Sequence, residues 1–72
     1  MPITSENLDN WFTYHPPTVT DTGNYVAIRD AGKVFAAVVL ACTPPSADQT
    51  AAVRKIREAV MTANVAIACG GK

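Results

Sequence analysis

The chain has 72 residues, enough for one small domain that lies close to the size limit of independent stability. Its two cysteines and single histidine lack the close spacing of metal ligands, which excludes a zinc site as the extra source of stability and favours partner subunits. Six basic and six acidic residues balance, so the charge excess of a non-specific DNA-binding protein is missing.

The first residues do not have the pattern of a targeting signal. Residues 1–6 show neither a basic start nor an apolar core, so we expect no signal peptide. The longest apolar run, residues 34–42, is far shorter than the roughly 20 residues of a membrane-spanning helix. We therefore expect a cytoplasmic protein with no membrane partner, in a reducing compartment that keeps its thiols free.

Residues 1–19 are predicted to form an N-terminal arm. Residues 5–11 favour one or two helical turns, whereas residues 12–17 are expected to be extended because they end in two prolines. Three large apolar side chains of the arm are expected to pack on the rest of the protein: Leu8, Trp11 and Phe12.

A first long helix is predicted over residues 21–41, inside a hairpin that comprises residues 20–72. Three side chains are candidates for its N-cap: Thr20, Asp21 and Thr22. Its inward stripe repeats every three or four residues and consists of Tyr25, Ile28, Gly32, Phe35, Val39 and Cys42. Val34 and Val38 extend the apolar surface around most of the circumference, which indicates burial on more than one side and therefore contacts between subunits.

A second helix is predicted to begin at Ser46, after the proline pair at 44–45. Ser46 and Gln49 fit a capping box, in which each side chain bonds to the backbone amide of the other residue. The inward stripe comprises Val53, Ile56, Val60, Ala63 and Ile67, flanked by Ala52, Ala59 and Ala66. Glycines at 70–71 provide the stop. Two helices joined by so short a turn should fold into an antiparallel hairpin, giving an all-α protein.

This arrangement keeps the two cysteines apart. Cys42 lies beside the turn and Cys69 at the far end of the second helix. Their separation is on the order of 30 Å at 1.5 Å per residue. A disulfide needs Cα atoms within about 7 Å, so we predict two structural thiols.

Catalysis is not indicated. His15 is the single histidine, no serine or cysteine sits on an elbow-type turn, and no glycine-rich phosphate loop is present. Asp30 and Glu58 lie in mid-helix with basic neighbours, where an ion pair is the simpler reading. We therefore expect a protein that is not an enzyme and uses no cofactor.

A binding function has more support. Aromatic side chains stack on nucleobases and cations neutralise phosphate, so Tyr14 and His15 near Arg29 and Lys33 would suit a nucleotide. Arg29 and Lys33 are four residues apart and share one helical face. The pattern also allows interpretations without a ligand. The cations could lie on a solvated helix face, and the aromatic residues could have a structural role.

Four stretches resemble a family of small phage proteins: residues 12–17 (FTYHPP), 25–36 (YVAIRDAGKVFA), 42–46 (CTPPS) and 57–68 (REAVMTANVAIA). The family is that of the anti-CBASS cyclic-oligonucleotide sponges, whose helical hairpin is shared with Thoeris anti-defence sponges. The resemblance covers almost the whole chain from Phe12 onward. The arm is shorter than in a typical member, and Gly32 replaces a better helix former, either for close helix approach or to leave room for a ligand.

The resemblance implies sequestration of cyclic di- and trinucleotide messengers in pockets between the protomers of a homo-hexamer. It implies that Tyr14 stacks on a base and that Arg29 or Lys33 contacts phosphate. His15, next to Tyr14, is a further candidate for ligand binding. A separate trinucleotide site at the three-fold axis would use Arg57, which could instead pair with Glu58 between subunits.

Two other functions remain alternatives. An oligomeric helical module that binds a protein would need the apolar surface and not the aromatic and basic residues. A regulator that binds DNA is disfavoured by the neutral charge and would show a strongly salt-dependent affinity.

Overall fold

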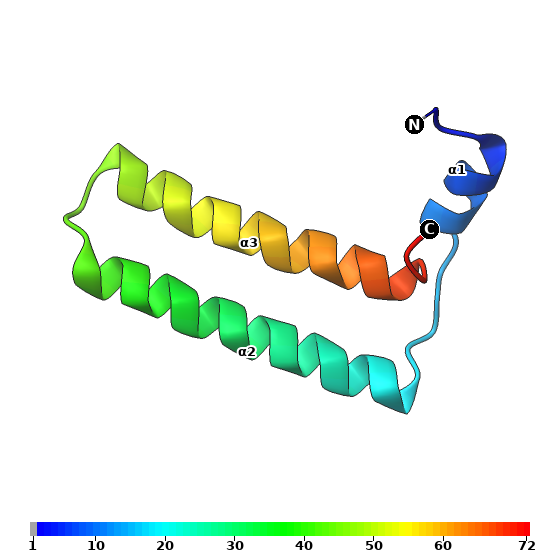
Figure 1. The fold of residues 1–72 in the computed structure, drawn as a ribbon, viewed down its shortest axis with the longest axis horizontal. Helices are drawn as coiled ribbons and strands as arrows, with labels where there is room; N and C mark the ends of the chain where they lie inside the picture. The colour runs from blue at the N-terminus through cyan, green and yellow to red at the C-terminus, as the bar shows by residue number, and fades with distance from the viewer. Residues whose placement is uncertain (1) are drawn as a thin grey trace.

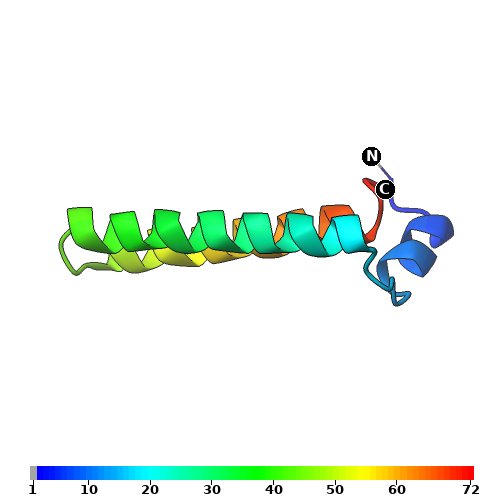
Figure 2. The same ribbon diagram turned by 90° about the horizontal axis from the view of Figure 1, so that it is seen from below.

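A computed structural model describes residues 2–72, which form three α-helices and no strand. α1 spans Ser5–Trp11, α2 spans Val19–Cys42 and α3 spans Ala47–Ala68. α2 and α3 lie side by side and antiparallel, joined by a short turn (Figure 1). The described residues measure 44 × 31 × 16 Å along their principal axes, and Figure 2 shows the two long helices in a single layer. The predicted all-α hairpin with a partly helical arm is confirmed.

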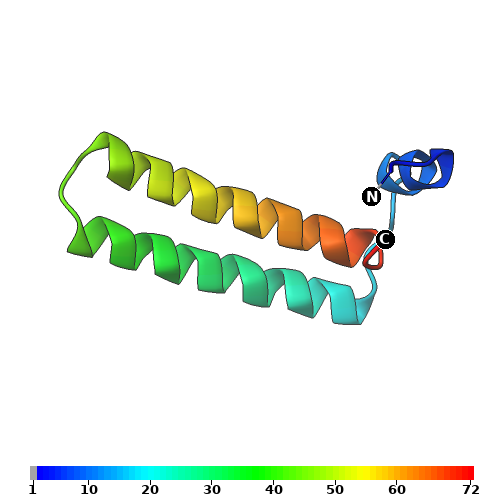
Figure 3. The ribbon, with the colours of Figure 1, turned by 45° about the horizontal axis from the view of Figure 1, so that its top comes forward.

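α1 lies beyond the open end of the hairpin and packs on neither long helix (Figure 3). Phe12, which follows it, is 83% exposed, and Leu8 and Trp11 are exposed as well. The prediction that these side chains pack on the hairpin is therefore wrong for Phe12, whereas Leu8 at 48% and Trp11 at 41% exposure are each covered over about half of their surface. The stretch after α1 contains no helix, as predicted from its prolines.

α2 begins earlier than predicted, at Val19. Its N-cap is Thr18, whose Oγ1 accepts from the Asp21 amide at 3.0 Å while Asp21 Oδ2 accepts from the Thr18 amide at 3.1 Å. The prediction of a cap at residues 20–22 is wrong because Thr18 and Asp21 form a reciprocal capping box, which satisfies two backbone amides at once.

The N-terminus of α3 confirms Ser46 as the cap, with its Oγ accepting from the Gln49 amide at 3.1 Å. The predicted return bond from Gln49 is wrong. The side-chain Nε2 of Gln49 instead donates to the backbone oxygen and to Oγ1 of Thr43, both at 3.1 Å. Gln49 therefore ties the end of α2 to the start of α3 across the proline turn.

α3 ends in the predicted glycine stop. Gly70 has φ +64° and its amide bonds to the Ile67 oxygen, while the Gly71 amide bonds to the Ala66 oxygen at 2.9 Å. These two bonds define a Schellman motif, which needs a left-handed residue directly after the helix. The motif leaves the Cys69 carbonyl outside the helical hydrogen-bond pattern.

The seam between the long helices confirms the predicted α3 stripe, whose members are all partly buried: Val53, Ile56, Val60, Ala63 and Ile67. On α2 the stripe is partly wrong, because Phe35 is 59% exposed and Cys42 is exposed. Ala36 is partly buried where Phe35 was predicted. A small side chain at this position suits a seam in which the two backbones approach closely.

Gly32 explains that close approach. A Cβ built on Gly32 would lie 2.5 Å from Val60 Cγ2, closer than carbon atoms can pack. Of the two roles left open for Gly32, this distance shows close helix approach, and room for a ligand stays a prediction.

The protomer has almost no core of its own. Among residues 2–72 the single buried apolar residue is Cys69, at 9% exposure. Large apolar side chains are exposed along both long helices, including Val34, Phe35, Val38, Leu40, Met61 and Val65. A chain of this size gains stability mainly by burying such groups, so the isolated hairpin lacks the usual source of stability.

The cysteines stay unpaired, as predicted: Cys42 is exposed, Cys69 is buried and both are free thiols. No helix in residues 2–72 combines the length and the apolar character needed to cross a membrane.

Candidate ligand-binding grooves and aromatic arm

Three of the predicted site residues come together in one groove on one side of the seam. Arg29 and Lys33 of α2 and Arg57 of α3 line this basic groove, which has a volume of about 250 Å³. Its floor is apolar and consists of Gly32, Ala36, Val53, Ile56, Val60 and Met61. The sequence placed Arg29 and Lys33 together; the pairing of α2 with α3 adds Arg57.

The position of the three cations follows from helical spacing. Arg29 and Lys33 stand one helical turn apart, and Arg57 follows the seam residue Ile56. All three side chains are exposed. Asp30 and Glu58 are their neighbours in the chain, but a step of about 100° around the helix axis turns them away, and neither lines the groove.

The electrostatics of the basic groove are therefore one-sided. Three cationic side chains line it and no carboxylate does. Like charges held near one another are unfavourable unless an anion or solvent lies between them. The groove thus provides what a ligand with more than one phosphate requires, namely several positive charges above an apolar floor.

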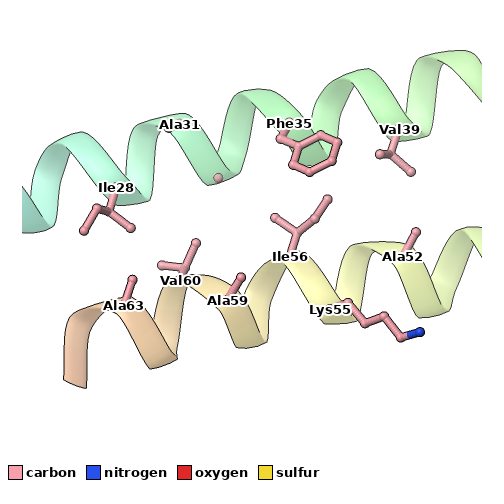
Figure 4. Close-up of a pocket in the computed structure, with 11 residues that line it drawn as sticks. Ile28, Ala31, Phe35, Val39, Ala52, Lys55, Ile56, Ala59, Val60 and Ala63 are labelled. Atoms are coloured by element: carbon pink, nitrogen blue, oxygen red, sulfur yellow. The ribbon is translucent and has the colours of Figure 1, made fainter. Parts of the chain in front are cut away.

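An apolar groove lies on the other side of the seam. Gly32, Ile56 and Val60 line both grooves, whereas the other lining residues of the two grooves differ. It has a volume of about 540 Å³, and its other lining residues are Ile28, Ala31, Phe35, Val39, Ala52, Lys55, Ala59 and Ala63. Figure 4 shows Phe35 and Val39 extending from α2 toward α3, while the Lys55 amine points away. The sequence analysis missed this groove by assigning Phe35 to the seam. Ala52 and Ala59, two of the alanines noted beside the α3 stripe, line it and were the signal for it.

The aromatic residues of the N-terminal arm do not line either groove. Tyr14 is 81% exposed and His15 is partly buried, and neither lines a groove of its own protomer. Arg29 lies ten residues after the start of α2, about 15 Å along the helix axis. Within one protomer the structure therefore does not join Tyr14 and His15 to the three cations.

Hydrogen bonds connect the arm to the end of α3. Asn10 Nδ2 donates to the Cys69 oxygen at 3.2 Å, and Asn7 Nδ2 donates to the Lys72 oxygen at 3.4 Å. His15 Nε2 lies 2.6 Å from the Asn10 oxygen. A carbonyl oxygen can only accept, so Nε2 carries the proton in this contact. The sequence pattern gave no signal for the bonds to Cys69 and Lys72, which join residues far apart in the chain.

The ionisable side chains that line the grooves are all cations. They are Arg29, Lys33 and Arg57 in the basic groove and Lys55 in the apolar groove, and neither groove is lined by a carboxylate, a hydroxyl, a thiol or an imidazole. In residues 2–72 no group of three or more His, Cys, Asp and Glu side chains is placed to hold a metal ion.

The profile of one protein family matches residues 4–68, and its description is Acb2/Tad1, hairpin domain. The chain belongs to this family. The matched range includes α1, α2 and α3 in full, so the arm and hairpin are matched as a unit. The resemblance seen in the sequence is thereby confirmed. No match was found among the curated proteins or among the solved structures.

Proposed function

We propose that this protein binds and sequesters cyclic di- and trinucleotides without cleaving them, and that it does so as a homo-oligomer. The observation that carries the proposal is the basic groove, in which three cations and no carboxylate surround an apolar floor. Membership of the Acb2/Tad1 hairpin family supports a cyclic-nucleotide sponge. In an infected bacterium, sequestration would keep the messenger from its effector and so block anti-phage signalling.

Each site residue has a physical role in this proposal. Arg29 and Lys33 neutralise the phosphates, and the exposed ring of Tyr14 stacks on a base. His15 stays with Tyr14 as a proposed member of the site. Arg57 extends the positive charge of the groove and is the proposed contact of cyclic trinucleotides, where copies of the chain meet.

The binding site is proposed to form between protomers. Tyr14 does not line the basic groove of its own chain, so a ligand that contacts Tyr14 and Arg29 together takes them from different copies. The apolar groove and the exposed side chains around Phe35 would be covered by other copies, most simply in a hexamer. Burial of that surface would supply the stability that the isolated hairpin lacks.

Calorimetry with a panel of cyclic di- and trinucleotides tests the proposal, with linear dinucleotides as the control ligands. We expect nanomolar affinity for at least one cyclic ligand and recovery of that ligand intact after the protein is denatured. Absence of heat with every cyclic ligand would reject the nucleotide, and recovery of a cleaved product would reject sequestration.

A second candidate function is a helical module that binds another protein, and the apolar groove favours it. It predicts that Tyr14, Arg29 and Lys33 are dispensable while Phe35 is not. Replacement of each residue by alanine, followed by a test of anti-phage defence in infected cells, separates the two functions.

A further inference from the structure

Two hydrogen bonds connect the N-terminal arm to the C-terminal end of α3, from Asn10 to Cys69 and from Asn7 to Lys72. α1 has seven residues, too few for a stable helix by itself, and it packs on neither α2 nor α3. The segment after it has no regular structure until Val19. Some other interaction must therefore determine where Tyr14 lies relative to the hairpin.

The contacts that do so form a continuous series. The Schellman motif at Gly70 leaves the Cys69 oxygen outside the helical pattern, where it accepts from the Lys72 amide at 3.3 Å and from Asn10 Nδ2 at 3.2 Å. The backbone oxygen of Asn10 in turn accepts from His15 Nε2 at 2.6 Å. Asn10 and His15 are both partly buried, which strengthens these bonds against competition from water.

This series closes a short loop from Asn10 to His15. The loop contains Phe12 and Tyr14, both more than four-fifths exposed at 83% and 81%. Thr13 adds a bond from its Oγ1 to the Asp9 oxygen, which further restricts the loop. A loop that holds two aromatic rings in water must be fixed by its polar contacts, because the rings themselves bury little surface.

We infer that Asn10 and His15 are positioning residues that hold the ring of Tyr14 in place for ligand binding, with the C-terminal cap of α3 as their anchor. The inference rests on the proposed function, since it assigns Tyr14 a ligand. Asn10 fixes α1 to the hairpin, and His15 fixes the aromatic loop to α1. A ring held in place before binding loses less conformational freedom when the ligand arrives, so the affinity is higher.

Two substitutions break the series at different points. Asn10→Ala removes the bond to Cys69, and His15→Phe keeps a ring of similar size but removes the donor. Asn24→Ala is the matched control, because Asn24 is an exposed asparagine on α2 that lines neither groove. Asn10→Gln retains the amide and should partly restore what Asn10→Ala loses.

The first measurement needs no nucleotide. Trp11 is the single tryptophan and forms the last residue of α1, so its fluorescence anisotropy decay reports the mobility of the arm. We expect Asn10→Ala to increase this mobility while Asn24→Ala leaves it unchanged. Unchanged Trp11 mobility in both Asn10→Ala and His15→Phe would overturn the inference, whatever the protein binds.

The second measurement is a double-mutant cycle in nucleotide affinity. Asn10→Ala and His15→Phe are each expected to weaken binding of the cyclic dinucleotide with the highest affinity by about tenfold. In a Tyr14→Ala background the same substitution should have no further effect, because its influence passes through Tyr14. Equal losses in both backgrounds would show a general structural effect and overturn the positioning role.

The two proposals fail in different ways. If the wild-type protein binds no cyclic nucleotide, the proposed function is rejected by calorimetry, whereas Trp11 mobility still decides whether Asn10 and His15 hold the arm. If the wild type binds and neither substitution changes affinity, sequestration stands and the positioning role is rejected. Circular dichroism and oligomer mass of each variant identify any that fails to fold.

Discussion

Gly32 of α2 faces Val60 of α3 so closely that a Cβ on Gly32 would lie 2.5 Å from Val60 Cγ2. Valine is branched at Cβ, so its methyl group can leave only by a change of the χ1 rotamer. The contact therefore determines how near the two helices lie, and with it the width of both grooves, since both residues line each of them.

The first prediction concerns this contact. Gly32→Ala should lower the free energy of unfolding, because overpacking of about 1–3 kcal/mol outweighs the gain of about 1 kcal/mol in helix propensity. Gly23→Ala, at a glycine of α2 with nothing within 4 Å, should instead raise it by roughly 0.5–1 kcal/mol. Chemical denaturation measures both variants. Equal stabilisation by both would contradict the close packing, and Val60→Ala should relieve the penalty of Gly32→Ala.

The basic groove carries the second prediction. Alanine at Arg29 or Lys33 should weaken binding of a cyclic dinucleotide by about 10- to 100-fold, because a charge-assisted bond to phosphate is lost. Arg54→Ala is the control, since Arg54 is exposed on α3 and lines neither groove. Calorimetry at two salt concentrations should also show a weaker salt dependence for the Arg29 and Lys33 variants. An equal effect of Arg54→Ala would assign the result to net charge.

The role proposed for Arg57 is tested by comparing its effect on cyclic dinucleotide and cyclic trinucleotide binding. Arg57→Ala should reduce affinity for cyclic trinucleotides more than for cyclic dinucleotides if it serves a separate site. A similar loss for both ligands would mean that Arg57 acts with Arg29 and Lys33 in the groove they share.

The third prediction concerns stacking by Tyr14. Tyr14→Phe keeps the ring and should retain most of the affinity, whereas Tyr14→Ala should weaken binding by about 5- to 150-fold, the range for one stacked base. The side chain is 81% exposed in the protomer, so neither change should alter the unfolding free energy by more than about 0.5 kcal/mol. A large loss of stability in Tyr14→Phe would assign Tyr14 to the assembly instead.

The fourth prediction concerns the apolar groove. Ala59→Glu should lower the oligomer mass measured by light scattering, because burial of a carboxylate between subunits is costly. Ala51→Glu is matched in residue type and helix, is exposed and lines neither groove, so it should leave the mass unchanged. A wild-type protein that is monomeric at micromolar concentration would reject the oligomer.

The fifth prediction links the cap of α3 to the arm. Gly70 has φ +64°, which costs a residue with a side chain about 1–2 kcal/mol, so Gly70→Ala should lower the unfolding free energy by that amount. The same variant should increase the mobility of Trp11, because the Cys69 oxygen loses its position. Fluorescence anisotropy measures the mobility of Trp11, and thermal unfolding measures the stability. A loss of stability with no change in Trp11 mobility would contradict the link between the α3 cap and the arm.

Local sequence patterns were sufficient to predict the helices and the turn between them. The proline pairs, Ser46 and the glycines at 70–71 act within a few residues of themselves, so the turn, the start of α3 and its end could be predicted. The α3 stripe was correct for the same reason, since helical spacing alone selects one face. The start of α2 was missed because Thr18 was not considered as a cap, although it forms a reciprocal capping box with Asp21.

The sequence by itself determined an all-α hairpin with an arm, its family, and the cations at Arg29 and Lys33 on one face. Only the tertiary structure decided that Ala36 and not Phe35 enters the seam, that Arg57 joins the other two cations, and that Asn10 meets Cys69. The bond between Asn10 and Cys69 depends on the path of the arm, whereas the first two outcomes depend on how closely and at what rotation α2 and α3 pack. That geometry is set by the contact of Gly32 with Val60, two residues far apart in the chain whose partnership no local spacing reveals.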